Sequence, residues 1–522
     1  MKTFLAQFVS LIHFVLSGFD RLRFRGESIL LSNQRGVDSY LYRQRIRYVD
    51  FMDHCQQLTH TLCQQTDQLA EAQGVPVRHL NSPKIDKEAI ALELAASQPC
   101  SAPAGRIALI TVLESCCTYR LRKNSEGRAY PVKQQGKCKH YYHYFLHPEL
   151  GLCYVRMQTY FPFTVRVGMN GRAWLYQQLR NRHVDFQHRG NLLLGVADVP
   201  LAQQIMADQV HADYAKILGE LVDPIQPLSA YLHTHAPYYW MGEQTEWAND
   251  FVFHSPDDLA IWYKRWIRHG IENLHCTDIV KYLGKKRPEL CHGEAKIDLR
   301  KRPEGTRLKF WYSTNSLKMY DKEGISLRIE TTINQPGEFK VFAKTTKAAA
   351  DETPQWRPMR KGVVDMERRT EVSQAANNRL LESLATVADT TTLGELLKPL
   401  GNRVSKNGKR VARALNPLTG KDGDLLRLLA TGDFLIKGFR NADIRAALYG
   451  STNDKTEGGK NEDAAEKRRQ SAAVTRLLFL LRAHGLIIKV KDSHRYHLSA
   501  SGRRTVTALS TAHECDATRL AA

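Results

Sequence analysis

The sequence predicts an α+β protein whose core is an antiparallel sheet with helices, followed by a C-terminal winged helix-turn-helix. Two observations predict the core: apolar and polar residues alternate over 106–161 and again over 294–333, with turn residues between the runs. A third predicts the last domain, because a short helix, a long helix and a basic hairpin follow one another between residues 438 and 503.

A chain of 522 residues is long enough for several domains of about 100–200 residues each. We expect an N-terminal helical region over 1–105 and an α+β core with two antiparallel meanders over 106–345. A linker with helices is expected over 346–421, and the winged helix over 422–512. The apolar share of 43% is that of an ordinary globular protein that can bury a core.

The N-terminal region begins with apolar residues at helical spacing, which predicts an amphipathic core helix; they are Phe4, Phe8, Leu11, Ile12, Val15 and Phe19. Gln7 and His13 interrupt the run, so a signal peptide is not expected. Residues 37–73 predict a second, long helix. No stretch reaches the roughly 20 apolar residues that cross a bilayer, and we expect a soluble cytoplasmic protein.

The core region contains both meanders and a mainly helical segment between them. The first meander covers residues 106–122, 137–146 and 152–161, and the second covers 294–333. Residues 171–283 are expected to be mainly helical. In that segment Glu246 and Asp250 are four residues apart, so they would share one helix face and could join a metal site.

The charge balance favours a polyanionic partner. The chain has 75 Lys and Arg against 54 Asp and Glu, a net charge of +21, and residues 401–522 hold 23 of the basic and 12 of the acidic residues. Release of counterions from phosphates drives such proteins to nucleic acids. Proteins of membrane surfaces and ribosome-associated proteins share this balance. The charge nevertheless favours nucleic acid, with DNA preferred and RNA left open.

The ten cysteines include no pair at the two-to-four-residue spacing that zinc sites favour. Reduced, mostly buried thiols are therefore expected. The chain also contains no phosphate-cradling GxxxxGK[ST] motif, so we expect no nucleotide cofactor.

The second meander has a polar face, because side chains of a strand alternate between its two sides. A solvated surface is the simplest interpretation. The alternative is phosphoryl chemistry, in which carboxylates hold Mg²⁺ or Mn²⁺; the candidate metal ligands are Glu294, Asp298, Asp321 and Glu330. Tyr320 would attack phosphorus, and the cations Lys318, Lys322 and Arg328 would neutralise the phosphate.

The segment N-S-L-K-M-Y-D-K…L-R-I-E, from Asn315 to Glu330, is similar to a signature of rolling-circle replication initiators and relaxases. That resemblance covers some 16 residues and implies roles for Tyr320, Asp321, Lys322 and Glu330. The His-hydrophobe-His metal motif of those enzymes has no match, since His233-Thr234-His235 has a polar central residue. The whole chain resembles bacterial proteins associated with mobile elements, a class without an assigned activity.

The winged-helix segment from Val474 to Arg503 resembles DNA-binding domains of bacterial transcription regulators. Other contacts to nucleic acid are expected from a sheet stripe of arginine and aromatic residues around 154–160 and from a basic loop at 356–362. The candidate nucleic-acid-binding residues are Arg156, Gln158, Arg307, Lys309, Asn315, Arg360, Lys361, Arg468, Arg469, Arg476, Lys489, Lys491 and Arg495.

Two function classes remain open at this point. In the first, the core handles a nucleic-acid strand and cuts it in a metal-dependent reaction, while the winged helix recognises a duplex. In the second, the protein is a non-catalytic transcription regulator or an RNA-binding scaffold, and the polar face only contacts the backbone of the nucleic acid.

Overall fold

The computed structural model describes residues 1–274, 276–284, 295–343, 355–388, 393–406, 409–430, 434, 438–449, 460–490 and 493–514. The chain divides into two compact units. The sheet unit comprises residues 9–264 and 296–377, and the helical unit comprises residues 1–8, 265–295 and 378–522. The α+β class expected from the sequence is confirmed.

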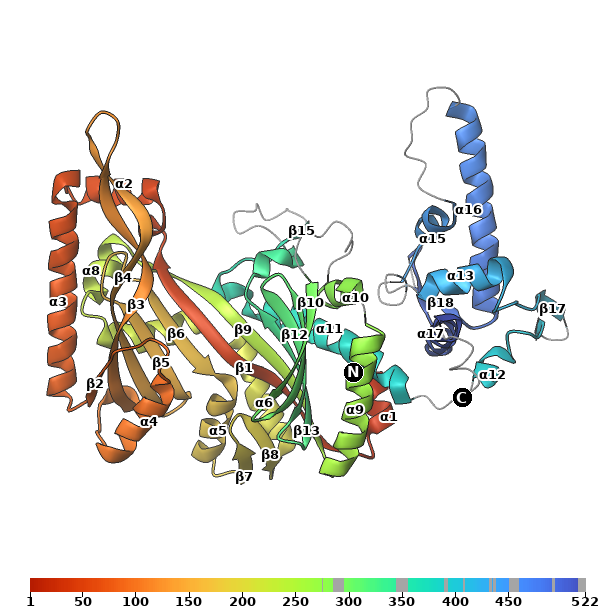
Figure 1. Ribbon diagram of the computed structural model, residues 1–522, viewed down its shortest axis with the longest axis horizontal. Helices are drawn as coiled ribbons and strands as arrows, with labels where there is room; N and C mark the ends of the chain where they lie inside the picture. The colour runs from red at the N-terminus through yellow and green to blue at the C-terminus, as the bar shows by residue number, and fades with distance from the viewer. Residues whose placement is uncertain are drawn as a thin grey trace. The chain divides into compact units, whose positions relative to one another are not determined.

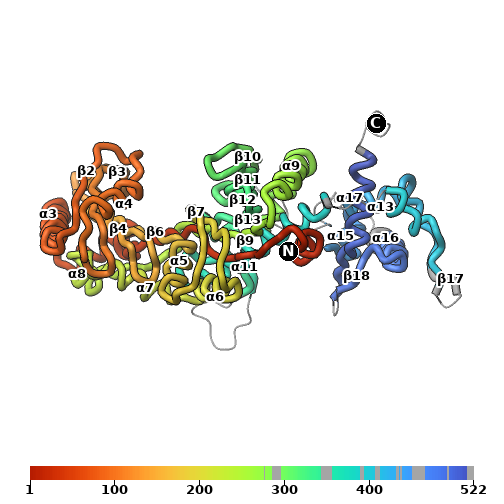
Figure 2. The backbone as a smooth tube through the Cα atoms, turned by 90° about the horizontal axis from the view of Figure 1, so that it is seen from below, coloured from red at the N-terminus to blue at the C-terminus, as the bar shows by residue number. Residues whose placement is uncertain are grey.

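The sheet unit is built on an 11-stranded sheet in the order β10-β11-β12-β13-β9-β1-β6-β5-β4-β3-β2. Every pair whose register is described is antiparallel, except β2 with β3. Figure 2 shows both ends of the sheet bending toward the same side. The strands are β1 (Ile12–Ser28), β2 (Val77–Leu80), β3 (Arg106–Lys123), β4 (Ala129–His147), β5 (Gly151–Gln158), β6 (Val165–Asn170), β9 (Tyr238–Phe253), β10 (Ala295–Arg302), β11 (Gly305–Tyr312), β12 (Asn315–Lys322) and β13 (Ser326–Ile333).

Both predicted meanders are confirmed, as β3-β4-β5 and as β10 to β13. The centre of the sheet was not predicted. The prediction of a helix over residues 4–19 is wrong. The helix α1 (Lys2–Phe8) is short, and β1 follows it and runs beside β9 (Figure 1). Within the segment expected to be mainly helical, residues 238–253 form β9. The helix expected over 37–73 is divided into α2 (Gln34–Arg43) and α3 (Phe51–Ala72).

One face of the sheet is apolar. Phe19, Leu22 and Phe24 of β1 pack there in a core that includes residues of α3, α7 (Tyr214–Val222) and α8 (Ser229–His235). On the same face, Asn377 of α11 (Met366–Ala385) hydrogen-bonds Asn249 and Thr331. This packing fixes which way each strand faces, because a shift by one residue would exchange the two faces.

The other face, here called the polar face, is only partly covered by helices. Ala91 and Leu94 of α4 (Lys87–Ser97) pack on β3 and β4 at one side. At the other side α5 (Gly171–Asn181) and α6 (Val199–Asp208) pack on Phe14 and Leu16. Outside the large sheet, the described strands form four pairs. Two belong to the sheet unit, β7 (Phe186–Arg189) with β8 (Leu192–Val196) and β14 (Lys340–Ala343) with β15 (Gln355–Pro358); the helical unit contains β16 (Val404–Lys406) with β17 (Lys409–Ala412) and a last pair given below.

The helical unit contains a core of leucines and other apolar residues from its C-terminal elements. Phe439 forms a β-bridge to Tyr496, beside the two-stranded pair β18 and β19. In the same unit Phe4 and Phe8 of α1 contact Trp266, the first with a tilted ring and the second edge to face. The further described elements of this unit are α10 (Cys276–Tyr282), α12 (Leu393–Leu397), α13 (Gly420–Ala430), α15 (Asn441–Tyr449), α16 (Lys460–Ala483), β18 (Ile487–Lys489), β19 (Tyr496–Leu498) and α17 (Ala500–Glu514). The boundaries between the units fall after α1, within α9 (Pro256–Glu272), after the first residue of β10 and within α11.

Among the described residues, no helix combines the length and the apolar character that crossing a bilayer requires.

Candidate functional site

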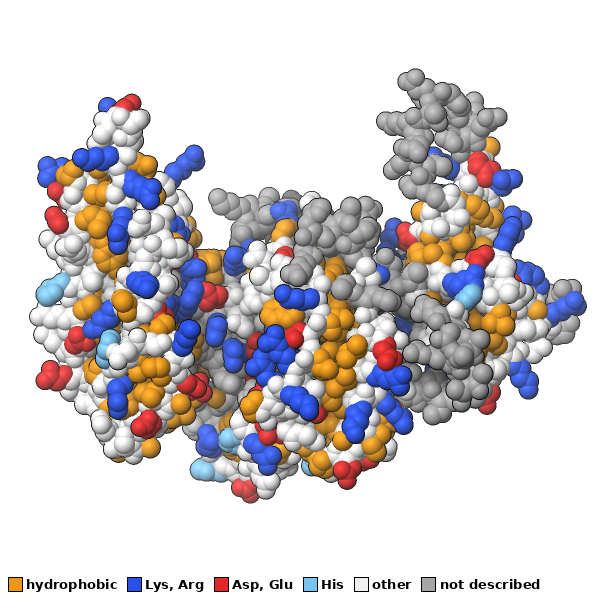
Figure 3. Space-filling model, in the orientation of Figure 1, with side chains coloured by type: hydrophobic (Ala, Val, Ile, Leu, Met, Phe, Trp, Pro, Cys, Tyr) orange, Lys and Arg blue, Asp and Glu red, His pale blue; other side chains and the backbone are white. Residues whose placement is uncertain are grey.

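The polar face carries charged side chains from most strands of the sheet, and Figure 3 shows Lys and Arg side chains gathered over its middle. The alternation predicted for β12 and β13 is confirmed. Lys318 lies opposite Glu330, and Tyr320 lies opposite Arg328. A wet surface was the simplest expectation for these strands, but all four side chains are buried. The face therefore has to balance its charges internally.

A β-bulge in β1 brings further charges to this point. The register of β1 and β9 shifts between Phe19 and Leu22, so that Asp20 and Arg21 together oppose Glu246. Because a bulge turns two successive side chains to one side, Asp20 reaches the polar face beside the carboxylates of β9. Glu246 and Asp250 share a face as predicted, but as alternate residues of a strand and not of a helix.

Arg328 is the centre of the first cluster. Its guanidinium lies 2.9 Å from Asp250 and 3.3 Å from Asp20, and it donates to the carbonyl oxygen of Asn191. Arg172 of α5 lies 2.8 Å from the same Asp250 carboxylate. Burial opposes the charge of Arg328, but Asp250 and Asp20 raise its pKa above the ordinary value. Arg328 is thus bound to protein carboxylates, which corrects its predicted role of neutralising a phosphate.

Lys318 is the centre of the second cluster. Its ammonium donates to Glu330 and, at 3.2 Å, to Glu246. Burial works against the charge, but the two carboxylates raise the pKa of Lys318, so that the ammonium stays charged. Burial raises the pKa of Glu330, against the attraction of Lys318 and with the repulsion of Glu246 and Asp20. Lys318 therefore neutralises these carboxylates and not a ligand.

Tyr320 and its neighbours differ in how accessible they are. Tyr320 is 7% exposed, and burial raises the pKa of its phenol, so the hydroxyl stays protonated. Lys322 is buried and pairs with Glu304 at 3.2 Å. Lys309 lies over the Trp311 ring, and burial together with the charges of Lys318 and Arg307 lowers its pKa to about 7. A buried, protonated phenol is a poor nucleophile in this arrangement.

Of the four predicted metal ligands, the three that the structure describes do not come together. Glu294 lies outside the described residues. Asp298 pairs with Arg300 and Arg307, and Asp321 accepts from the Thr306 amide. Only Glu330 belongs to a group of converging carboxylates, with Asp20 and Glu246, whose oxygens lie within 4.8 Å of one another. The candidate ligand set from the sequence is corrected accordingly.

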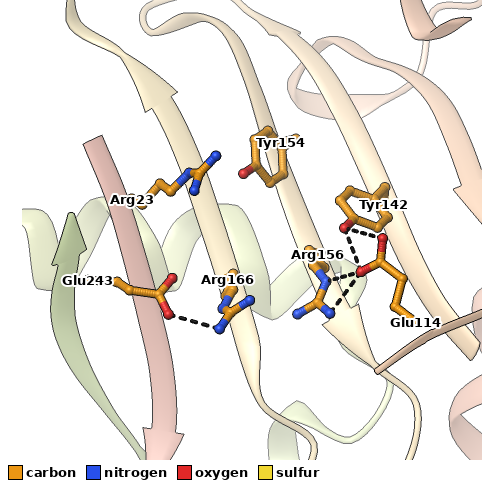
Figure 4. A pocket seen from close by; sticks show the side chains of 7 residues that line it. All are labelled: Arg23, Glu114, Tyr142, Tyr154, Arg156, Arg166 and Glu243. Atoms are coloured by element: carbon orange, nitrogen blue, oxygen red, sulfur yellow. Dashed lines mark hydrogen bonds and ion pairs between the residues drawn. The ribbon is translucent and has the colours of Figure 1, made fainter. Parts of the chain in front are cut away.

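A small pocket of about 150 Å³ opens on the polar face over β1, β3, β4, β5, β6 and β9 (Figure 4). Arg156, one of the predicted nucleic-acid contacts, lies in it and donates to Glu114 at 2.9 Å, as does the Tyr142 hydroxyl. Burial alone would raise the pKa of Glu114, but Arg156, Tyr142 and Lys87 lower it below its ordinary value. The residues that line the pocket are Arg23, Glu114, Tyr142, Tyr154, Arg156, Arg166 and Glu243.

Several other predicted contacts serve the fold. Gln158 is buried and donates to the carbonyl oxygens of Cys117 and Tyr160. Asn315 is fully buried and accepts from the amides of Asn334 and Gln335. Both side chains are occupied by backbone groups, which corrects their assignment to a nucleic-acid surface.

The basic loop before α11 keeps part of its predicted character. Arg360 is paired with Asp365 at 3.0 Å. Lys361 is exposed.

Arg307, another predicted nucleic-acid contact, lies on β11 outside this loop. It is paired with Asp298 and mostly buried.

In the helical unit, one face of α16 is exposed between residues 468 and 482. Arg468, Arg476 and Arg482 are exposed there with Phe479, whereas Val474, Leu478 and Leu481 are buried on the opposite side. Lys489 at the end of β18 is exposed as well. Arg469 pairs with Glu466 at 2.8 Å, Arg495 lies in the turn before β19, and Lys491 lies outside the described residues.

Two groups escaped the sequence. Asp20 and Arg21 were not predicted as site residues, because the apolar residues before them have a helical spacing that predicted a helix where the structure has β1. Cys116, Cys138 and His140 lie together on β3 and β4, with the two sulfurs 3.3 Å apart. The sequence has no metal-ligand spacing that indicates this group, because Cys116 and Cys138 come together only through strand pairing; Cys138-x-His140 was its one local sign.

The two histidines of the His233-Thr234-His235 segment have protein partners. His233 is paired with Asp223, and His235 with Gln44.

Comparisons with known proteins assign no family. No family model matches the chain, and no curated protein matches it significantly. Among solved structures, the di-domain ARO/CYC BexL from the BE-7585A biosynthetic pathway matches 54% of this chain and 99% of its own, at 9% identity and a TM-score of 0.14. A similarity this low supports neither a shared fold nor a shared function.

Proposed function

We propose that the protein binds nucleic acid, with DNA as the favoured partner, through a winged helix formed by residues 422–512. The observation that carries this proposal is the exposed row Arg468, Arg476 and Arg482 on α16. None of the three makes an ion pair or side-chain hydrogen bond with another residue in the part of the chain that is described. Unpaired arginines on one helix face are available to phosphates.

The order of elements supports a winged helix. Three helices, α13, α15 and α16, are followed by the pair β18 and β19, and the bridge from Phe439 to Tyr496 adds a third extended segment. In winged helices the last of the three helices enters the major groove and the hairpin lies along the backbone. In this proposal α16 is the recognition helix and Lys489 belongs to the wing.

The dimensions agree with a groove contact. Arg468 and Arg482 are separated by about 21 Å along a helix that rises 1.5 Å per residue. The major groove is about 12 Å wide and accepts one helix. Phe479 is 56% exposed between the arginines, where it can contact a thymine methyl group.

The test replaces the three arginines together. We expect R468Q/R476Q/R482Q to weaken duplex binding on the order of a hundredfold at physiological salt, because each lost phosphate contact removes one released counterion. The slope of log affinity against log salt should fall by about three. Fluorescence anisotropy of a labelled duplex, measured over a salt series, gives both values.

The matched control is R43Q/R120Q/R122Q, which removes the same charge from exposed positions of the sheet unit. Its affinity and salt slope should remain close to those of the wild type. Equal losses in both triple variants would show that only net charge matters, and the winged-helix proposal would fail.

A second candidate function, metal-dependent strand cleavage at Tyr320, is favoured by the converging oxygens of Asp20, Glu246 and Glu330. Carboxylates are the ligands that Mg²⁺ and Mn²⁺ prefer. However, Lys318 already bonds Glu246 and Glu330, and Arg328 lies beside Asp20. The charge of the group is compensated, so these residues do not fit a resident divalent ion as they are arranged.

The same arrangement leads to a negative expectation for cleavage. With Tyr320 buried, we expect no covalent tyrosyl adduct when labelled single-stranded oligonucleotides are incubated with the protein and Mg²⁺ or Mn²⁺. Denaturing gels detect both adduct and product. An adduct that forms with the wild type and disappears in Tyr320→Phe, with affinity unchanged, would establish the cleavage function and contradict this expectation.

A further inference from the structure

We propose that the pocket on the polar face binds a phosphate monoester dianion, held by Arg23, Arg156 and Arg166. Strands β1, β5 and β6 each supply one of these guanidinium groups, and all three line the same cavity (Figure 4). The proposal is independent of duplex binding by the helical unit, because every residue of the pocket belongs to the sheet unit.

The charges of the pocket match a dianion. Arg156 and Lys87 both lie within 3.3 Å of Glu114, and Arg166 lies 2.9 Å from Glu243. The lining holds three arginines and two carboxylates. Lys87 does not line the pocket, but its ion pair neutralises Glu114, so the whole group of four cations and two carboxylates keeps two positive charges. A phosphate monoester carries nearly two negative charges at neutral pH. Carboxylates and phosphodiesters carry one and would leave the pocket positive.

The two carboxylates also orient their arginines. The Glu114 carboxylate pairs with Nε and Nη2 of Arg156 and accepts a hydrogen bond from the Tyr142 hydroxyl. The Glu243 carboxylate pairs with Nη2 of Arg166. A guanidinium has five N–H donors, so each arginine keeps further donors while its position is fixed. Pre-oriented donors lose less conformational entropy when an anion binds.

Arg23 and Tyr154 are the two groups that lack partners of their own. Arg23 is exposed and makes no ion pair or hydrogen bond with any residue that the structure describes, and the Tyr154 hydroxyl makes no hydrogen bond with any of them. In Figure 4 the guanidinium of Arg23 and the hydroxyl of Tyr154 point toward one another. A phosphate between them would accept from both.

Gly168 makes room for this arrangement. It pairs with Arg23 on one side and with Tyr154 on the other. A Cβ atom at this position would lie 2.2 Å from the Tyr154 ring, so the ring can lie across β6 only because the residue is glycine. Glycine otherwise weakens a strand and often marks a close approach of another group.

The size of the pocket limits the ligand. About 150 Å³ is smaller than the roughly 300–1,000 Å³ of pockets that enclose a complete small molecule. The pocket therefore takes the phosphate group and leaves the rest of the molecule outside. The phosphate can come from the 5′ end of a nucleic-acid strand or from a small phosphorylated metabolite.

The first experiment titrates the full-length protein with inorganic phosphate in chloride buffer at pH 7.5, by isothermal calorimetry. We expect Arg23→Gln to raise the dissociation constant by about tenfold or more, because a charge-assisted contact is lost. Tyr154→Phe keeps the ring and loses one neutral hydrogen bond, so about a threefold increase is expected. Gly168→Val should displace the ring and abolish binding at this site.

The matched control is Arg120→Gln, which removes one exposed charge from β3 outside the pocket; its dissociation constant should stay within about twofold of the wild type, since screened surface charges contribute little. Thermal unfolding checks the fold of Gly168→Val, and Tyr154→Phe keeps the test valid if that variant is unstable. Phosphate binding that is absent, or that is unchanged in Arg23→Gln, overturns the proposal.

The second experiment identifies the source of the phosphate. A short single-stranded oligonucleotide is compared with and without a 5′-phosphate, in the wild type and in Arg23→Gln. A preference of about tenfold for the phosphorylated strand that Arg23→Gln abolishes assigns the pocket to strand ends. Equal binding of both strands, with inorganic phosphate still bound, assigns it to a small phosphate monoester.

Discussion

Replacing Arg328 with methionine is expected to lower the free energy of unfolding of the sheet unit by about 3–5 kcal/mol, the usual cost of removing one partner of a buried ion pair. Arg328 is 1% exposed and lies between Asp250 and Asp20. Methionine fills a similar volume but leaves the Asp20 carboxylate without its nearest cation. Urea unfolding followed by circular dichroism measures the change.

Two further variants make this result specific. Arg268→Met removes an exposed partner of Glu272 and should change stability little, because surface pairs contribute about 0–1 kcal/mol. Adding Asp20→Asn to Arg328→Met should recover part of the lost free energy of unfolding, because an amide leaves no unpaired charge in the buried cluster. If the free energy of unfolding of Arg328→Met lies within about 1 kcal/mol of the wild-type value, the ion pairs of this cluster are solvated and not buried.

The stability of the helical unit should decline as the pH falls from 6.5 to 4 because of His269. Burial lowers the pKa of His269 to about 4, and its ring hydrogen-bonds Ser383. The folded state thus holds the ring neutral, whereas the unfolded chain takes up a proton below pH 6.5. The neutral ring contributes fully to the free energy of unfolding above pH 6.5, and this contribution is lost as the pH falls to 4. At 1.36 kcal/mol per unit of pKa, the loss amounts to about 3 kcal/mol.

His269→Gln isolates this contribution, because glutamine can still hydrogen-bond Ser383 but does not titrate. Urea unfolding at pH 7.5 and at pH 4.5 should show that the wild type loses about 2–3 kcal/mol more than the variant on acidification. Other acidic groups titrate in both proteins and cancel in the difference. Parallel losses in the two proteins would mean that His269 is already charged in the folded state.

The second meander was predictable because its information is local. Each strand of residues 295–333 alternates apolar and polar residues, and the turns between the strands are short. The same alternation placed Lys318, Tyr320, Arg328 and Glu330 on one side. What local alternation cannot show is whether that side faces water, because this depends on segments far along the chain that fold over it.

The central strands were missed for a different reason. Before Asp20, the apolar residues from Phe4 to Phe19 fit a helical spacing, and the register of β1 with β9 shifts twice in this part of the chain, between Ile12 and Phe14 and between Phe19 and Leu22. A sign of the strand was nevertheless present, since Arg21, Arg23 and Arg25 alternate with Leu22 and Phe24. Asp20 and Glu246 reach Glu330 only through pairing between distant strands, and no local pattern encodes that register.

The place of β1 in the sheet also has a consequence for biosynthesis. Phe19 pairs with Trp247, and Arg21 pairs with Asn170, so β1, which is synthesised before β6 and β9, waits for both of its neighbours. Until they emerge, its two hydrogen-bonding edges and its aromatic side chains are open to association with other chains. The arginines that line one side of this strand carry like charges, and charges on unpaired strands oppose such association. Arg23, which lines the pocket in the finished protein, can thus help to protect the nascent chain before the pocket exists.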